Sequence, residues 1–338
     1  MRHTDADQFI TIQQHIMEQQ RKHPTATGDF SWLLSGLTLA AGMIQAIVRR
    51  AGLVNILGSA ESENVHGEQQ QKLDVYADRV IERCLESRGN VGVAGSEEKP
   101  EPIVLPVRDD APGRYVVLFD PLDGSGNIDV NVAVGTIFSI YERVTAGPVR
   151  DGGLRDVLQP GDRQLAAGYV VYGSSTVLVY TTGDGVHLFT FDPATGAFML
   201  SEERVRIPAN GKIYSVNEAN ADSFPRGVQE FLRYCKSKES GPYSSRYIGS
   251  MVADVHRTLL KGGIFMYPQT AKAPRGKLRL MYEANPMAFI IEQAGGQATD
   301  GQTNILAKQP AELHERTPLY IGETADVKRV MELLARHA

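Results

Sequence analysis

Two short acidic stretches flank one apolar run in this chain. Glu97-Glu98 precedes the run, Asp120 and Asp123 follow it, and residues 115–119 between them have the length and composition of a buried strand. Four carboxylates gathered in one place repel one another unless cations lie among them. Because no Cys or His cluster lies nearby in the sequence, we expect hard cations such as Mg²⁺ or Mn²⁺, which prefer oxygen ligands. The fold must therefore bring a strand end to a metal site.

The second acidic stretch continues into a glycine-rich turn. Residues 124–126 read Gly-Ser-Gly, and such a segment leaves backbone N–H groups free to face an anion. Carboxylates beside an anion-binding turn are typical of metal-assisted phosphate chemistry. Taken alone, Glu97-Glu98 would be interpreted as a solvated loop. Residues 120–124 alone could form a turn or a Ca²⁺-binding loop, although they lack the residue spacing of an EF-hand. The pair joined by a strand is more specific than either part.

Composition limits the class of protein. A chain of 338 residues with 42% hydrophobic and 22% charged residues is long enough for two globular domains. The net charge of −5 disfavours nucleic acid or an anionic membrane as the main partner. Cys84 and Cys235 make no disulfide framework, the N-terminus lacks a signal-peptide core, and Gly42 and Gln45 interrupt the apolar residues 37–48. We expect a cytoplasmic protein that does not span a membrane.

The expected elements change type along the chain. Apolar spacing predicts helices over 30–48, with cap candidates at 27–29, and over 73–85, with an aperiodic polar loop at 52–71. Strands are expected at 115–119, 137–141, 168–172, 176–181 and 186–191, with turns at 183–185 and 192–196. Strands and helices alternate again after about residue 206, including a helix capped by Asn285 and ended by Gly295-Gly296, and a last helix capped by Asp326.

A third polar pattern lies at residues 277–283. As a strand, this segment places Lys277, Arg279, Met281 and Glu283 on one face, which suits a phosphorylated substrate beside a metal. The alternative is an exposed edge strand with its charges outward.

Other chemistries are disfavoured. Ser250, Asp254 and His256 suggest a triad, but residues 251–259 have the apolar spacing of a core helix and no G-x-S-x-G elbow is present. No phosphate-binding P-loop or dinucleotide-binding glycine motif follows an expected strand. Cys84 lies on the apolar side of its helix and is interpreted as a core residue.

These segments together resemble class I fructose-1,6-bisphosphatase. The matching residues are 72–75, 95–98, 120–127, 244–257 and 276–283, and the resemblance runs from about Phe9 to the C-terminus. The wider superfamily of Mg²⁺-dependent, Li⁺-sensitive sugar and inositol phosphatases shares only the acidic motifs. The resemblance implies an α/β fold, a layered αβαβα sandwich of the sugar phosphatase type. It also implies a regulatory and metal-motif domain at 1–205, a substrate-binding α/β domain at 206–338, and a homotetramer.

The resemblance also implies the chemistry. Two or more divalent cations per subunit, Mg²⁺ with Mn²⁺ or Zn²⁺ as alternatives, would be held by Glu97, Glu98, Asp120, Asp123, Glu283 and the Leu122 carbonyl. Asp74 and Glu98 would position and deprotonate the attacking water. The implied reaction is hydrolysis of the 1-phosphate of fructose 1,6-bisphosphate by in-line attack of water, without a phosphoenzyme.

Substrate and effector residues follow from the same resemblance. Backbone groups of Gly124 and Ser125 would hold the 1-phosphate, and the 6-phosphate would meet Asn217, Tyr247, Tyr267 and, from a neighbouring subunit, Arg246. The sugar would meet Lys277 and the Met251 backbone, and Asp123 and Arg279 would also bind substrate. AMP would bind at Thr27, Gly28, Ser31, Arg114 and Tyr115, and Asn64 and Glu68 would lie in a loop that folds over the metals.

This sequence departs from the family pattern at several positions. Gly126 replaces a serine, Asn220 a 6-phosphate tyrosine and Glu68 an aspartate, and Ser31 and Arg114 are substituted within the expected AMP site. Two other functions stay open. One is a bifunctional enzyme that also accepts sedoheptulose 1,7-bisphosphate, and the other is a catalytically silent regulator that binds metal and sugar phosphate.

Overall fold

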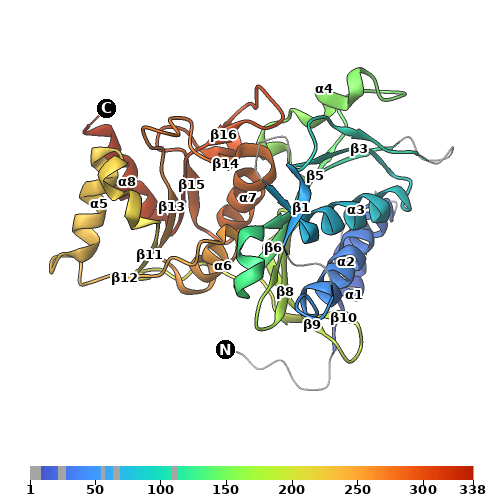
Figure 1. Ribbon diagram of the computed structural model, residues 1–338, viewed down its shortest axis with the longest axis horizontal. Coiled ribbons are helices and arrows are strands. Elements are labelled where there is room, and N and C mark those ends of the chain that lie inside the picture. Colours follow the sequence, from blue (N-terminus) through green and yellow to red (C-terminus); the bar gives the residue numbers. More distant parts are fainter. Residues whose placement is uncertain (1–8, 22–27, 55–57, 64–68, 108–112, 338) are drawn as a thin grey trace.

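The computed structural model describes residues 9–21, 28–54, 58–63, 69–107 and 113–337 (Figure 1). Its layers alternate as helix, sheet, helix, sheet and helix, which is the αβαβα sandwich predicted from the sequence. Apolar clusters fill the spaces between successive layers. The fold class is therefore confirmed.

The larger sheet has eight strands in the order β10-β9-β8-β7-β6-β5-β3-β4. All neighbours are antiparallel except β3 and β5, which run parallel. The strands are β3 (Val91–Ser96), β4 (Ile103–Val104), β5 (Tyr115–Asp123), β6 (Val134–Glu142), β7 (Ala166–Tyr172), β8 (Thr176–Thr181), β9 (Val186–Asp192) and β10 (Ala197–Glu202). The predicted strands and the turns at 183–185 and 192–196 are confirmed.

The smaller sheet has five strands in the order β12-β11-β13-β17-β15. These are β11 (Ile213–Ser215), β12 (Ser244–Ser245), β13 (Ile264–Tyr267), β15 (Gln297–Thr299) and β17 (Leu319–Gly322). Two further pairs of short strands lie outside these sheets among the described residues. They are β1 (Ser59–Glu63) with β2 (Gln69–Gln71), and β14 (Leu278–Arg279) with β16 (Arg316–Thr317).

Helices occupy the three remaining layers, as Figure 1 shows. On the outer face of the larger sheet lie α1 (Ile12–Arg21), α2 (Asp29–Val48) and α3 (Lys72–Glu86). Between the sheets lie α6 (Met251–Lys261) and α7 (Asn285–Gln293), and outside the smaller sheet lie α5 (Arg226–Lys236) and α8 (Thr324–Ala335). A short helix, α4, spans Leu154–Val157.

Helix α2 is long and apolar enough to meet the length and composition criteria for a membrane span, but half of that window is buried inside the protein. A core helix passes the same test, and Leu33, Leu37 and Ile44 of α2 lie in the core against α3 and the sheet. Gly28 occupies the N-cap position without a side-chain cap bond.

Three local expectations away from the acidic stretches were wrong. The polar stretch 52–71 is not wholly a loop, because β1 and β2 pair within it; neither strand carries the apolar alternation that marks a half-buried strand. Asn285 does not cap α7, because a π-helix over Leu280–Ala284 runs directly into that helix. Asp326 lies inside the first turn of α8, where its carboxylate accepts a hydrogen bond from the Tyr243 hydroxyl at 2.7 Å.

Candidate active site

Parallel pairing of β3 and β5 sets the position of the acidic residues. Ser96 pairs with Phe119, and the Glu97 N–H donates to the Phe119 carbonyl at 3.1 Å, so Glu97 and Asp120 follow neighbouring residues of the two paired strands. The sequence predicted that strand β5 ends before Asp120, which was wrong. The strand continues to Asp123, with a register shift against β6 between Asp120 and Asp123. This irregularity accommodates Pro121, which has no N–H to donate to a ladder.

Three carboxylates meet at this point. Oxygen atoms of Asp120, Asp123 and Glu283 all lie within 4.8 Å of one another, and all three side chains are buried. Burial, together with the nearby charge of Glu97, raises the pKa of Asp123 to about 7 and raises the pKa of Asp120 and Glu283 well above its ordinary value. A divalent cation among these oxygens would remove the repulsion, so the donor set fits Mg²⁺ or Mn²⁺.

Glu97 and Glu98 differ in their surroundings. The Oε1 atom of Glu97 lies 3.0 Å from Nε of Arg279, and both side chains are buried. Glu98 is half-buried, and its charge contributes to the raised pKa of Asp74. Leu122 is buried between the two aspartates, and its N–H donates to Oδ1 of Asp120 at 2.9 Å. All the predicted metal ligands therefore lie at the ends of β3 and β5 or on the segment that follows β14.

That segment is not the strand predicted for residues 277–283. Only Leu278–Arg279 forms a strand, and the π-helix follows at once. The π turn folds Glu283 back, so that its Oε2 accepts a hydrogen bond from the Arg279 N–H at 2.5 Å. Every residue from 278 to 284 is buried, so the buried face no longer alternates and the strand pattern was misleading. Lys277 is exposed, whereas Arg279 is buried beside Glu97.

The N-terminus of α6 supports the second aspartate. Oδ2 of Asp123 accepts hydrogen bonds from the Val252 N–H at 2.8 Å and, more weakly, from the Ser250 hydroxyl at 3.4 Å. The positive end of the helix dipole also favours a carboxylate there. Sequence reasoning did not give Ser250 this role.

Asp254 was also missed. It is buried and accepts hydrogen bonds from the Ser215 hydroxyl at 2.7 Å and from the N–H groups of Ile248 and Gly249 at 3.1 and 3.0 Å. It thereby fixes the loop before α6. The sequence offered Asp254 only as a member of a rejected triad and of the family-matching segment 244–257, without this supporting role. His256 Nδ1 instead lies 3.0 Å from the Tyr169 hydroxyl, so the rejection of a triad was correct.

Asp74 lies near the start of α3 and is buried. Its Oδ2 accepts a hydrogen bond from the Gln71 N–H at 2.9 Å. Burial is the largest cause that raises the pKa of Asp74 to about 7, and the charge of Glu98 adds to it. A carboxylate with a pKa near neutrality is suited to accept a proton at the pH of the cell.

A cavity of about 400 Å³ opens onto the carboxylates. Its lining includes the predicted residues Asp123, Tyr247, Met251, Tyr267, Lys277, Arg279 and Glu283. A second cavity of about 120 Å³ shares Tyr247, Tyr267 and Lys277 with it and adds Asn217 and Asn220. Gly124 borders Ser250, and Ser125 hydrogen-bonds to Asp74. Arg246 is exposed and lines neither cavity. Phe265 and Arg316 also line the larger cavity, and sequence reasoning missed them.

The expected effector residues lie elsewhere, around the start of α2 and of β5. The Ser31 hydroxyl donates to Oε1 of Gln20 at 2.6 Å, and Nε of Arg114 donates to Glu142 at 2.8 Å. Tyr115 is buried, and Gly28 is the N-cap of α2. Thr27, Asn64 and Glu68 lie outside the described residues.

Buried carboxylates at the end of parallel strands, facing a cavity with basic side chains, define a metal-dependent phosphatase of the αβαβα type. Two family models match the chain: "Fructose-1-6-bisphosphatase, N-terminal domain" over residues 10–203 and "Fructose-1-6-bisphosphatase, C-terminal domain" over residues 207–335. The chain belongs to the fructose-1,6-bisphosphatase family, as its motifs predicted. Membership implies a requirement for a divalent metal.

Individual relatives agree with the family models. The class 1 fructose-1,6-bisphosphatase of Chlorobium luteolum is 55% identical and covers 95% of this chain and 96% of its own length. That of Chlorobium chlorochromatii is 56% identical over 94% and 96%. The fructose-1,6-bisphosphatase of Leishmania major in holo form is 41% identical with a TM-score of 0.92, covering 97% of this chain and 100% of that chain. Its apo form has a TM-score of 0.87 at 39% identity, with the same coverage of both chains.

Proposed function

We propose that the protein is a fructose-1,6-bisphosphatase that hydrolyses the 1-phosphate of D-fructose 1,6-bisphosphate to fructose 6-phosphate and phosphate. The observation that carries this proposal is the buried cluster of Asp120, Asp123 and Glu283, which borders a cavity also lined by Lys277 and Arg279. Relatives of the same name match almost the whole chain.

The carboxylates would hold two or more Mg²⁺ ions, with Mn²⁺ or Zn²⁺ as alternatives. Glu97, Glu98, Asp120, Asp123, Glu283 and the Leu122 carbonyl supply oxygen atoms for them, the preferred ligands of hard cations. When bound, such ions neutralise phosphate charge and make a water molecule more acidic. Arg279 holds the Glu97 side chain in place through their 3.0 Å contact.

Asp74, together with Glu98, would position the attacking water and accept its proton. The pKa of Asp74, near 7 because of burial and the charge of Glu98, supports this role. A purely structural role is the alternative, since Asp74 also accepts the Gln71 N–H at the start of α3. An amide at position 74 could still accept that hydrogen bond but could not take a proton, which separates the two roles.

The two adjoining cavities support a bisphosphate as substrate. The larger one borders the carboxylates, near Gly124 and Ser125, whose backbone would hold the 1-phosphate. The smaller one would hold the 6-phosphate with Asn217, Tyr247 and Tyr267. Lys277 lines both cavities and would meet the sugar between the two phosphates. Arg246 would reach the 6-phosphate of a neighbouring subunit, which its exposure allows.

Assembly and regulation are part of the same proposal. The protein would be a homotetramer, and apolar surface that Trp32, Leu39 and Met43 expose on α2 supports a contact between subunits there. AMP would bind at the start of α2, near Gly28, Ser31, Arg114 and Tyr115. The two domains would divide near residue 205, where the larger sheet ends and the two family models meet, and the enzyme would act in the cytoplasm.

Phosphate release tests the proposal. We expect turnover of fructose 1,6-bisphosphate with Mg²⁺ or Mn²⁺, none with EDTA, and inhibition by AMP. Asp74→Asn should lower kcat by about 100-fold or more without lowering the midpoint of thermal unfolding. Asp222→Asn, which removes one exposed carboxylate, is the matched control.

Two outcomes would redirect the proposal. Bisphosphate binding by calorimetry without any turnover would favour a silent regulator. A kcat/KM for sedoheptulose 1,7-bisphosphate equal to that for fructose 1,6-bisphosphate would favour a bifunctional enzyme.

A further inference from the structure

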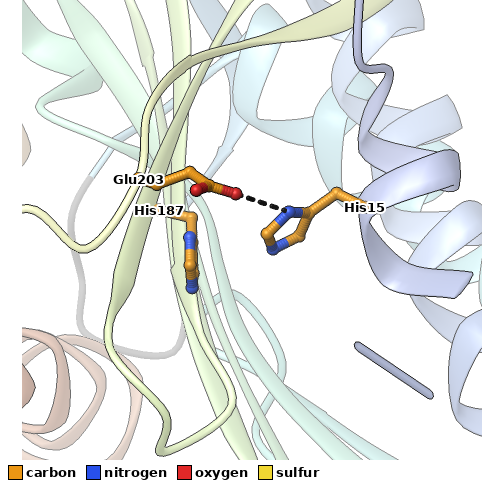
Figure 2. Close-up of side chains that lie close together, drawn as sticks. All are labelled: His15, His187 and Glu203. Carbon is orange, nitrogen blue, oxygen red and sulfur yellow. Dashed lines mark ion pairs between the residues drawn. The ribbon is translucent and has the colours of Figure 1, made fainter. Parts of the chain in front are cut away.

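A second cluster of metal-binding side chains lies away from the active-site cavity. It consists of His15 on α1, His187 on β9 and Glu203 just after β10, so the helix near the N-terminus meets a pair of consecutive strands (Figure 2). None of these residues lines the active-site cavity or belongs to the carboxylate cluster. The active site therefore gives no reason for their meeting.

The three side chains converge closely. One ligand atom from each lies within 4.8 Å of the others, and the two imidazole rings are 4.4 Å apart between centroids. Nδ1 of His15 is 3.7 Å from Oε1 of Glu203. The dashed line in Figure 2 marks this pair. Zn–N bonds of about 2.0–2.1 Å in a tetrahedral site place ligand atoms about 3.3 Å apart. Small side-chain adjustments would suffice, and the Glu203 side chain, 57% exposed, is free to make one.

His187 indicates that the cluster is more than an ion pair. Its side chain is buried, and its Nδ1 has no hydrogen-bond partner among the described residues. An ion pair between His15 and Glu203 would leave this nitrogen unexplained. Burial first, and then the neighbouring His15, lower the pKa of His187 to about 4, so the ring is neutral at pH 7. Neutral imidazole is the form that binds metals.

The surroundings hold the two histidines in place. Aromatic rings of Phe189 and Tyr180 contact His15 at centroid distances of 5.4 and 6.0 Å. The chain before α1 is joined to β10 by the hydrogen bond from the Leu200 N–H to the Ile10 carbonyl at 2.9 Å. Helix α1 thus presents His15 to the sheet before any metal binds, and such pre-organisation favours binding.

We propose that His15, His187 and Glu203 form a site for a borderline transition-metal cation of the Zn²⁺ class, which cross-links α1 to the β9–β10 edge of the larger sheet. Two imidazoles and one carboxylate are a ligand set typical of Zn²⁺ with one position left open. Mg²⁺ and Ca²⁺ prefer oxygen ligands and would not compete at this site. The exposed carboxylate gives the ion a route from solvent.

Co²⁺ and Zn²⁺ titrations in saturating Mg²⁺ test this site, because Mg²⁺ competes with both ions for the oxygen-rich active site, and Asp120→Asn identifies any ion that still binds there. We expect about one equivalent of tightly bound Zn²⁺ per chain that Asp120→Asn retains, and a visible Co²⁺ absorption of four-coordinate type. Glu203→Gln should weaken Zn²⁺ binding by about tenfold or more and reduce the Co²⁺ band. Glu202→Gln, the adjacent exposed carboxylate, should change neither and is the matched control.

Further variants make the test decisive. His187→Gln should abolish the Co²⁺ band, and Asp120→Asn in the active site should leave it intact. The proposal is overturned if Glu203→Gln binds Zn²⁺ as the native chain does, or if Asp120→Asn removes the band. Because Glu203 is exposed, its variant decides the matter even if His187→Gln does not fold.

Discussion

Without bound metal, the native enzyme should be less stable than the inactive variant Asp123→Asn, which lacks one of the buried carboxylates. Burial and the charge of Glu97 raise the pKa of Asp123 from 3.8 to about 7. Each pKa unit corresponds to about 1.4 kcal/mol, so ionising this carboxyl above pH 7 costs the metal-free protein about 4 kcal/mol. Asp123→Asn removes that cost. The amide oxygen can still accept the hydrogen bond that the Val252 N–H donates at 2.8 Å.

The pH dependence follows from the direction of the shift. A carboxyl whose folded pKa is raised stabilises the fold below its unfolded pKa, near 4, and loses that contribution as pH rises through about 7. The native chain in EDTA should therefore become less stable between pH 5 and pH 8. Asp123→Asn should show a shallower decrease, because one of the buried titrating groups is gone.

Thermal and urea unfolding in EDTA measure this effect. At pH 8 we expect Asp123→Asn to be about 3 kcal/mol more stable, after the loss of the weak hydrogen bond from the Ser250 hydroxyl. For a chain of this length that difference corresponds to about 4 °C in Tm. Saturating Mg²⁺ should reverse the order, since the native site binds it and the variant binds it poorly. Asp222→Asn is the control for loss of one exposed charge. Equal or lower stability of Asp123→Asn in EDTA at pH 8 would refute the reasoning.

Three further substitutions test other contacts. Gly126→Ser should lower KM for the bisphosphate by about 2–10-fold, because the new hydroxyl can add one hydrogen bond to the phosphate. The side chain fits there, since a Cβ at Gly126 meets nothing within 4 Å. Gly126→Ala is the control, and an equal effect of both substitutions would contradict this expectation. Arg279→Met should destabilise the EDTA-treated protein by about 3 kcal/mol in urea, and by less with Mg²⁺, because it leaves Glu97 buried and unpaired. Burial raises the pKa of Asp326 to about 6, so its ionisation costs stability above that pH. Asp326→Asn, which still accepts from Tyr243, should therefore add about 2–3 kcal/mol in urea unfolding at pH 8 and nothing at pH 4.

The sequence predicted helices and strands accurately where a single hydrophobic periodicity dominates a segment. Helix α2 and strand β8 were placed within one residue, because apolar residues recur at helical spacing in the first and form a compact β-rich run in the second. The prediction that the two acidic stretches converge was correct, because strand pairing brings the ends of β3 and β5 together. The family motifs then assigned roles that no spacing rule could supply.

Other features depend on contacts between distant segments. The support of Asp123 by the N-terminus of α6 joins residues more than a hundred positions apart. The π turn before α7 has no sequence signal of its own, because the alternating segment around it also fits a strand, so alternation gave the wrong face to Met281. Likewise, His15, His187 and Glu203 carry no common motif and meet only because α1 packs against the edge of the sheet.

The active site is an electrostatically strained part of a well-packed fold. Asp120 and Glu283 are buried against like charges, while Arg279, the Val252 N–H and the dipole of α6 offset only part of the repulsion. A bound cation removes the remaining repulsion and thereby lowers the free energy of the folded protein. Metal affinity and instability of the metal-free protein thus have the same origin. A substitution that stabilises the metal-free protein by removing this repulsion must therefore weaken metal binding. A variant with higher stability in EDTA and unchanged metal affinity would break this link.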